Sequence, residues 1–258
     1  MNKKSFFEIY AHEYDMMTDA HQREKMHDKE VAAIIEKFKP EKVLDAGCAT
    51  GLTSMLFARR GITTVGFDRS RKMIELAKRK FHDSNLPLSF KCGHFEKIPK
   101  GLHGKFDLVV CLANSISGVG TLTGLQKSLD NFHVALKPGG VLLLQLLNYR
   151  ALQDGELMPV KVTENDGLIH ARMTERQGKC FRLYVLRIDL KQTPPRLEAF
   201  QSEFDNFTEQ QVMAGLKKAR FTVIHKYANL LMDRKYTRAS RDLVISAAKP
   251  SGSAKAKA

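Results

Sequence analysis

A short stretch from Val43 to Gly51 constrains the fold of this chain more than any other feature. It reads V-L-D-A-G-C-A-T-G, so an apolar strand ends at Asp45, a loop of small residues follows, and an amphipathic run opens at Leu52. A strand, a small-residue loop and a helix in this order predict an α/β domain that offers backbone N–H groups and a helix N-terminus to a polar ligand. The two glycines of the loop allow positive φ and let a ligand approach the backbone closely.

The loop does not match the dinucleotide fingerprint G-x-G-x-x-G, which would need glycine where this chain has Ala49 and Leu52. An NAD-dependent oxidoreductase is therefore the weakest interpretation. The stretch resembles instead the first motif of the class I S-adenosylmethionine (SAM)-dependent methyltransferases, usually D-x-G-x-G-x-G and here D-A-G-C-A-T-G. A plain strand–turn–helix joint is the alternative that this motif alone leaves open.

Later motifs strengthen the resemblance. The run F-D-L-V-V-C-L-A-N-S at 106–115 has the near-continuous apolar character of a strand buried on both faces, and it resembles the fourth motif of the family. The segment L-K-P-G-G at 136–140, followed by an apolar strand at 141–147, resembles a late fold signature of the same family. L-A-N-S and the N-Y at 148–149 are similar to the glycine/sarcosine N-methyltransferase-like branch.

The pattern predicts an α/β fold with a Rossmann-like, doubly wound, seven-stranded sheet that ends in a C-terminal antiparallel hairpin at 221–226 and 243–247. Three β-like segments, at 160–163, 168–174 and 180–190, predict a small inserted antiparallel β lid over the substrate. We expect four parts: an N-terminal lid segment at 1–21 that orders on the cofactor, a methyltransferase domain at 22–248, its substrate-lid insert at 151–205, and a disordered tail at 249–258.

Asp68 is the candidate ribose ligand. It ends a β-rich segment about 20 residues after Gly47, where doubly wound nucleotide folds place an acid on the ribose hydroxyls. A carboxylate can accept both O–H bonds of a ribose diol. A helix-capping role for Asp68 is the alternative.

The resemblance implies further cofactor contacts. The methionine and ribose would be lined by Gly47, Cys48, Ala49 and Gly51 of the first loop, and the methionine amino group would lie near Asp45. The adenine would be flanked by Phe95 and Glu96, and the cofactor would be covered by Leu112 and Tyr14.

The residues that would face the acceptor are Asn114, Asn148, Tyr149 and Arg187. For Asn114, a simple turn position is an equal alternative. No residue is assigned as catalytic, because SAM supplies an activated methyl group. The protein then needs only to align the acceptor, exclude water and leave the acceptor lone pair free.

The net charge of +14 raises the possibility of a nucleic-acid partner, but the basic residues are dispersed along the chain. The N-P-P-Y and Pro-Cys signatures typical of RNA base methyltransferases do not occur in the fourth motif, which reads C-L-A-N. The sequence therefore predicts a SAM-dependent methyltransferase with a small-molecule acceptor, preferably an amine. The alternatives are an RNA methyltransferase and a non-catalytic SAM-binding protein.

Four cysteines without a C-x-x-C pair predict reduced thiols in a cytoplasmic protein and no metal site. No apolar run approaches the ~20 residues of a membrane span, and residues 1–10 lack the apolar core of a secretory signal, so we expect no membrane partner. The oligomeric state is left open.

Overall fold

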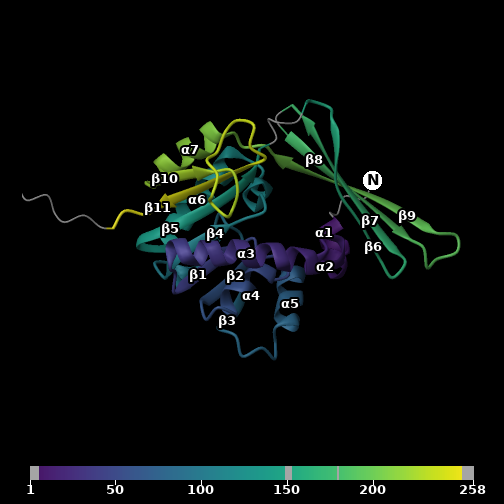
Figure 1. Cartoon of the computed structure of the whole chain (residues 1–258), viewed down its shortest axis with the longest axis horizontal. Helices are drawn as coiled ribbons and strands as arrows, with labels where there is room; N and C mark the ends of the chain where they lie inside the picture. The colour runs from purple at the N-terminus through teal and green to yellow at the C-terminus, as the bar shows by residue number, and fades with distance from the viewer. Residues whose placement is uncertain (1–5, 149–152, 179, 252–258) are drawn as a thin grey trace, which may run out of the picture.

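The protein contains a seven-stranded mixed sheet and a separate four-stranded antiparallel sheet (Figure 1). The structure, a computed structural model, describes residues 6–148, 153–178 and 180–251 of the 258-residue chain. The strand order of the large sheet is β10-β11-β5-β4-β1-β2-β3. Its strands are β1 (Lys42–Ala46), β2 (Thr63–Asp68), β3 (Leu88–Cys92), β4 (Phe106–Cys111), β5 (Leu136–Leu147), β10 (Thr222–Tyr227) and β11 (Asp242–Ala248).

Strands β1 to β5 pair in parallel, and β11 runs antiparallel to both β5 and β10. This confirms the predicted doubly wound sheet and its C-terminal hairpin. Strand β5 starts earlier than expected, because Leu136 in the L-K-P-G-G segment already pairs with Phe106 across a register shift. The carboxyl ends of β1, β2, β4 and β5 consequently lie along one edge, where open α/β sheets bind ligands.

Helices cover both faces of the large sheet. Two of them share an apolar cluster with Val43 and Leu108 on one face: α3 (Ala20–Phe38) and α4 (Leu52–Ala58). On the other face, α6 (Leu122–Ala135) and α7 (Glu209–Lys218) pack with Leu44 and Val109. Three further helices are α5 (Arg71–Lys80), η2 (Lys100–Leu102) and η3 (Ser115–Val119).

The small sheet has the order β6-β7-β8-β9 and is antiparallel throughout, as its sequence pattern predicted. Its strands are β6 (Leu157–Asn165), β7 (Leu168–Gln177), β8 (Cys180–Asp189) and β9 (Arg196–Asp205). The sequence indicated only the first three. The fourth begins directly after Pro194-Pro195, a pair that favours a loop, and its apolar alternation breaks at Ala199-Phe200.

The N-terminal segment forms three short helices beside the small sheet (Figure 1): α1 (Phe6–Ile9), η1 (Ala11–Glu13) and α2 (Tyr14–Met17). Phe6 and Met17 are buried in one cluster with Val185 and Phe200 of the small sheet. The segment therefore packs on the insert in this structure, and its mobility stays a prediction.

Lys249, which the sequence places in the tail, donates from Nζ to the carbonyls of His133 and Leu136 at 2.9 and 2.8 Å. Among the described residues, no helix is both long and apolar enough to cross a membrane.

Candidate cofactor and acceptor site

The loop after β1 is fixed by its backbone conformation and by close packing. Gly47 and Gly51 have φ of +89° and +86°, and Ala49 between them also has a positive φ of 47°. A Cβ on Gly47 would lie 2.5 Å from Ser115 Oγ, closer than real Cβ contacts, so only glycine fits without movement of the loop after β4. The first loop is thus clamped against the loop after β4 at the carboxyl edge of the sheet.

Asp45 at the end of β1 is buried, with 3% of its surface exposed. Burial raises the pKa of its carboxyl group to about 6, even though the Ser54 hydroxyl donates to Oδ2 at 2.5 Å; the nearby Asp68 charge also raises it. A buried carboxyl group is costly to ionise, and a cation placed next to it lowers this cost. Asp45 is therefore prepared for a positively charged ligand group.

Asp68 at the end of β2 is held by the backbone of two segments. Oδ2 accepts from Ala49 N at 3.0 Å, and Oδ1 accepts from Ser70 N at 2.8 Å. A carboxylate has about four acceptor sites, so these two bonds leave capacity for hydroxyl donors. Asp68 thus lies at the N-terminus of α5, which fits the capping alternative, and it also bonds to the first loop; its contact with a ribose stays a prediction.

A cavity of about 80 Å³ lies over the first loop. Of the predicted cofactor residues it is lined by Tyr14, Asp45, Gly47, Cys48, Ala49 and Leu112, while Gly51, Asp68, Phe95 and Glu96 lie outside its lining. Phe95 nevertheless lies close, because its Cζ is 3.5 Å from the position of a Cβ on Gly47. The roles of all these residues toward a cofactor stay predictions.

The N-terminal segment forms part of the wall of this cavity through Tyr14. Thr50 Oγ1 donates to Asp15 Oδ1 at 2.5 Å, and Lys80 Nζ pairs with Asp15 Oδ2 at 2.8 Å. These bonds tie the residue next to Tyr14 to both the first loop and α5.

Two cavity residues on α3 were missed by the sequence analysis, Arg23 and His27. Arg23 Nη1 donates to Thr18 Oγ1 at 2.9 Å, and its guanidinium lies 5.8 Å from the Tyr14 ring centroid. Burial, with a smaller contribution from the Arg23 charge, lowers the pKa of His27 to about 4, so its imidazole is neutral at physiological pH. Their spacing of four residues on one helix face was the available signal, but polar residues with this spacing occur on most surface helices.

A second cavity of about 220 Å³ lies at the carboxyl end of β5. Its lining combines apolar and polar side chains from the end of β5, the approach to α7 and the loop before β11: Leu146, Leu147, Asn148, Asn206, Phe207, Thr208, Glu209, Tyr236, Arg238 and Leu243. Thr208 and Gln211 form a capping box, which fixes the start of α7 beside this cavity.

Asn114 lies between the two cavities. Its buried Oδ1 accepts from Leu147 N at 3.1 Å and from Ser117 Oγ at 2.9 Å, which joins the loop after β4 to the end of β5. Asn148 Nδ2 donates to the carbonyls of Arg238 and Ser240, both at 2.8 Å. Asn148 lines the second cavity, whereas Asn114 holds the wall between them. Tyr149 lies outside the described residues.

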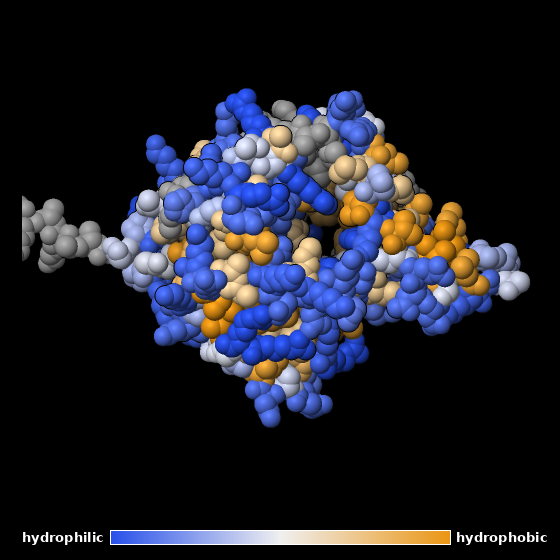
Figure 2. Space-filling view, viewed as in Figure 1, coloured by the Kyte–Doolittle hydropathy of each residue, from blue (hydrophilic) through white to orange (hydrophobic). Residues whose placement is uncertain are grey.

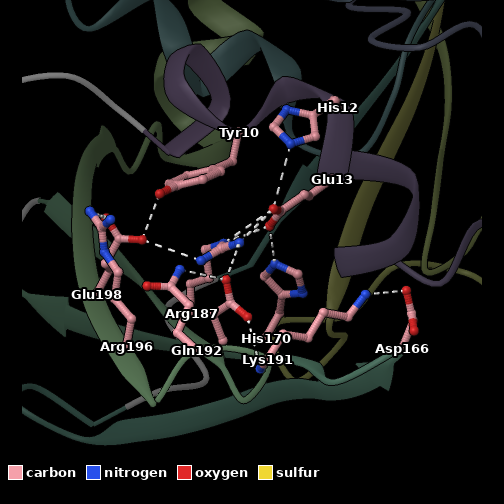
Figure 3. Close-up of polar contacts among 11 residues, drawn as sticks. Tyr10, His12, Glu13, Asp166, His170, Arg187, Lys191, Gln192, Arg196 and Glu198 are labelled. Atoms are coloured by element: carbon pink, nitrogen blue, oxygen red, sulfur yellow. Dashed lines mark hydrogen bonds and ion pairs between the residues drawn. The ribbon is translucent and has the colours of Figure 1, made fainter. Parts of the chain in front are cut away.

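Arg187 does not line either cavity. It lies on the face of the small sheet that is turned toward the N-terminal segment (Figure 3). Its guanidinium donates to Glu13 from Nε and Nη2 at 2.9 Å and pairs with Glu198 at 3.3 Å. Glu13 also contacts His170 Nε2 at 2.7 Å. Burial raises the pKa of Glu13, but the hydrogen bonds from Arg187 and His170 outweigh burial and hold it below its ordinary value. A contact of Arg187 with the acceptor stays a prediction.

Comparisons with known proteins agree with this architecture. Residues 43–140 match the model of a methyltransferase domain family. A glycine/sarcosine N-methyltransferase of Parasynechococcus marenigrum is 25% identical over 153 residues, which cover 59% of this chain and 54% of the relative. A ubiquinone biosynthesis O-methyltransferase of Coxiella burnetii is 29% identical over 110 residues, covering 43% and 45%.

The solved structure of CalS10 from Micromonospora echinaspora is 20% identical, covers 96% of this chain and 100% of that one, and has a TM-score of 0.72. Residues 43–140 therefore match a methyltransferase domain, and the chain as a whole has the fold of the SAM-dependent methyltransferases. It spans about half the length of the curated relatives described above. The CalS10 structure has SAM bound.

The residues of the site at the carboxyl edge of the sheet fit SAM. SAM carries an ammonium group, a carboxylate, a ribose diol and an adenine, and the site offers a buried carboxylate in Asp45, a guanidinium in Arg23 and an acceptor in Asp68. The positive φ of Gly47 and Ala49 brings the loop backbone close to the cavity. Among the described residues, no group of three or more His, Cys, Asp or Glu side chains could hold a metal ion.

Proposed function

We propose that this protein transfers the methyl group of SAM to a small-molecule amine. The observation that carries the proposal is the pair of cavities at one sheet edge, separated by the loop that Asn114 joins to β5. The second cavity, at about 220 Å³, is below the 300–1,000 Å³ typical of drug-sized ligands, which favours a small acceptor. The name of the Parasynechococcus relative and the description of CalS10 as an amino pentose methyltransferase favour an amine.

In this proposal Asp45 binds the methionine ammonium, Arg23 binds the methionine carboxylate and Asp68 binds the ribose diol. The charges support this assignment. The buried Asp45 gains most from a cation, and Arg23 is the cationic side chain among the described residues that line the first cavity. Phe95 and Glu96 are proposed to flank the adenine from the loop after β3, and Leu112 to pack on the cofactor.

The N-terminal segment is proposed to open for the cofactor. The cavity of about 80 Å³ is far smaller than a pocket for a nucleoside-sized ligand. Because Tyr14 lines it and Asp15 is bonded to Thr50, movement of this segment is the direct way to enlarge it. Reclosure over the cofactor would exclude water from the reaction.

SAM supplies the activated methyl group when bound, so the protein has to position the acceptor and keep its lone pair free. An amine must lose its proton before it can attack. The apolar side chains in the second cavity, Leu146, Leu147, Phe207 and Leu243, disfavour the ammonium form through desolvation. Asn148, Thr208 and Tyr236 are in place to orient a small polar acceptor.

The test is SAM turnover with a panel of small amines and phenols, read as S-adenosylhomocysteine formed. We expect turnover with one or more amines, and slower turnover with Asp68→Ala when SAM is limiting. Turnover of phenols alone would contradict the amine assignment and favour the chemistry in the name of the Coxiella relative.

An RNA methyltransferase is the alternative that the +14 charge keeps open. It predicts RNA affinity that falls steeply with salt, since each neutralised phosphate releases counterions. Salt-steep RNA binding with RNA methylation and no turnover of small acceptors would replace the present proposal, and tight SAM binding with no turnover would favour a non-catalytic SAM-binding protein. We also propose a reducing, cytoplasmic location, which the four free cysteines support.

A further inference from the structure

The small sheet has two faces of very different chemistry. Lys161, His170 and Arg187 point to the N-terminal segment, where they bond to Asp19 and Glu13. Successive side chains of a strand point to opposite faces, so the residues between these lie on the other side, here called the outer face. Three cross-strand rows make its centre: Pro159, Met173, Tyr184 and Gln201; Val162, Ala171, Leu186 and Ala199; Glu164, Ile169, Ile188 and Leu197.

The outer face is apolar and open to solvent. Val162 and Leu197 are 65% and 64% exposed, and Leu157 on the same face is 54% exposed. Nine large hydrophobic side chains are exposed among the described residues, and five of them lie on this sheet or in its turns. Figure 2 shows apolar residues gathered over the sheet, with polar residues around them. Monomeric proteins rarely expose a continuous apolar patch of this extent without a partner.

The charge of the face points to the kind of partner. The chain has 42 Lys and Arg residues, yet none stands in the three central rows. An acidic protein or a nucleic acid would gain little from such a face. A second copy of the same face would bring few like charges together, since Glu164 is the one charged residue of the three rows, while the basic remainder of each surface disfavours other orientations.

The size of the face also suits a second copy. Four strands about 4.8 Å apart and nine or ten residues long at about 3.4 Å per residue give a face of roughly 650 Å². Besides the three apolar rows, this area includes a row at one end made of Leu157, Glu175, Arg182 and Glu203. The whole area is close to the ~800 Å² that each partner contributes to a standard stable interface. Two such sheets pack face to face about 10 Å apart, and a two-fold axis brings the same patch of both subunits together. We propose that this protein is a homodimer in which the outer faces of the two small sheets pack together.

The test compares the full chain with Val162→Asp, Leu197→Asp and a control, Leu122→Asp, by sedimentation velocity between 1 and 100 µM. Leu122 is 53% exposed, similar to the other two, but lies at the start of α6 away from the small sheet, where an acid suits the helix N-terminus. We expect wild type and Leu122→Asp to have twice the 29.2 kDa mass of one chain. Either face variant should weaken self-association at least ~100-fold, because a two-fold interface loses the contact twice.

Circular dichroism and SAM titration show whether the variants stay folded, and both side chains are solvent-exposed in a single chain. A wild-type protein that is monomeric at 100 µM would overturn the proposal. A monomer that binds lipid vesicles would overturn it too, because the partner of this face would then be a membrane. A dimer that both face variants leave intact would also overturn it, because the interface would then lie elsewhere. Loss of the dimer in Leu122→Asp as well would show a general effect of added acid and would count against this face.

Discussion

Replacing the buried Asp45 by Asn is expected to stabilise the cofactor-free protein at neutral pH while weakening SAM binding. Burial raises the Asp45 pKa from 3.8 to about 6. At 1.36 kcal/mol for each pKa unit, ionised Asp45 costs the folded state about 3 kcal/mol. Asn has nearly the same shape and keeps an acceptor for the Ser54 hydroxyl, but it carries no charge to desolvate.

The sign of this effect depends on pH. Below pH 3.8 the carboxyl group is protonated in both the folded and the unfolded state, so ionisation costs nothing. Between pH 3.8 and about 6 only the unfolded state loses the proton, so the free energy of unfolding falls as the pH rises. Above about pH 6 the full cost is present. A new amide also brings a penalty of about 1–3 kcal/mol if its NH₂ group finds no partner, but that penalty does not change with pH.

Urea unfolding of wild type and Asp45→Asn at pH 8, 6 and 4 separates these contributions. The stability of the variant relative to wild type should fall by about 2.5 kcal/mol from pH 8 to pH 4, since part of the cost already exists at pH 4. Asp107→Asn is the matched control. Burial raises the pKa of Asp107, but the hydrogen bond from Lys137 and those from the backbone outweigh it and hold the pKa below its ordinary value, so the control should lose stability at pH 8. A relative stability of Asp45→Asn that does not change with pH would refute the reasoning.

Calorimetry on the same variant should show SAM affinity about 10- to 100-fold lower at pH 8, since a charge-assisted bond to the ammonium is lost. For wild type, affinity should fall below about pH 6 as Asp45 takes up a proton. Unchanged affinity in Asp45→Asn would remove this residue from the cofactor site.

Four other predictions test the remaining parts of the molecule. Asp68→Ala should cost SAM binding about 2–3 kcal/mol by calorimetry, because charged acceptors make the stronger hydrogen bonds, and unchanged affinity would reject the ribose assignment. Limited proteolysis within 6–21 should slow when SAM is added, whereas equal cleavage in both states would argue against a lid. Glu13→Ala should lower the free energy of unfolding by about 3–5 kcal/mol, since it leaves the buried Arg187 guanidinium without its main partner. Thr208→Ala should cost about 1 kcal/mol through loss of the capping box, a value that urea titration can resolve.

The fold was predictable because its signals are local. The apolar run at 106–110 and the small-residue loop after Asp45 each have one natural place in a doubly wound sheet. The boundaries were less certain. Strand β9 follows two prolines, and β5 begins inside a Pro-Gly-Gly segment, so in both places the sheet pairing overrides residues that favour loops.

The candidate site was predictable where a residue directly follows a strand. Asp45 and Asp68 lie at strand ends, and the structure brings both to the same edge. Arg23 and His27 were not found, because the position of α3 over the first loop decides that they line the cavity, and their own spacing does not. Arg187 illustrates the same difficulty, since its partner Glu13 is 174 residues away in sequence and no local pattern indicates the pair.

The long-range contacts of the N-terminal segment indicate how the proposed lid would open. The N-terminal segment is bonded on one side to the first loop and α5, through Asp15, and on the other side to the small sheet, through Glu13. The first set of contacts is partly exposed, whereas the pair of Glu13 with Arg187 is buried. Breaking a buried pair costs more than breaking an exposed one, so the segment should separate from the first loop while it stays on the small sheet. If SAM enters in this way, the lid and the small sheet move as one unit, and the proteolysis that SAM suppresses should be confined to the contacts around Asp15.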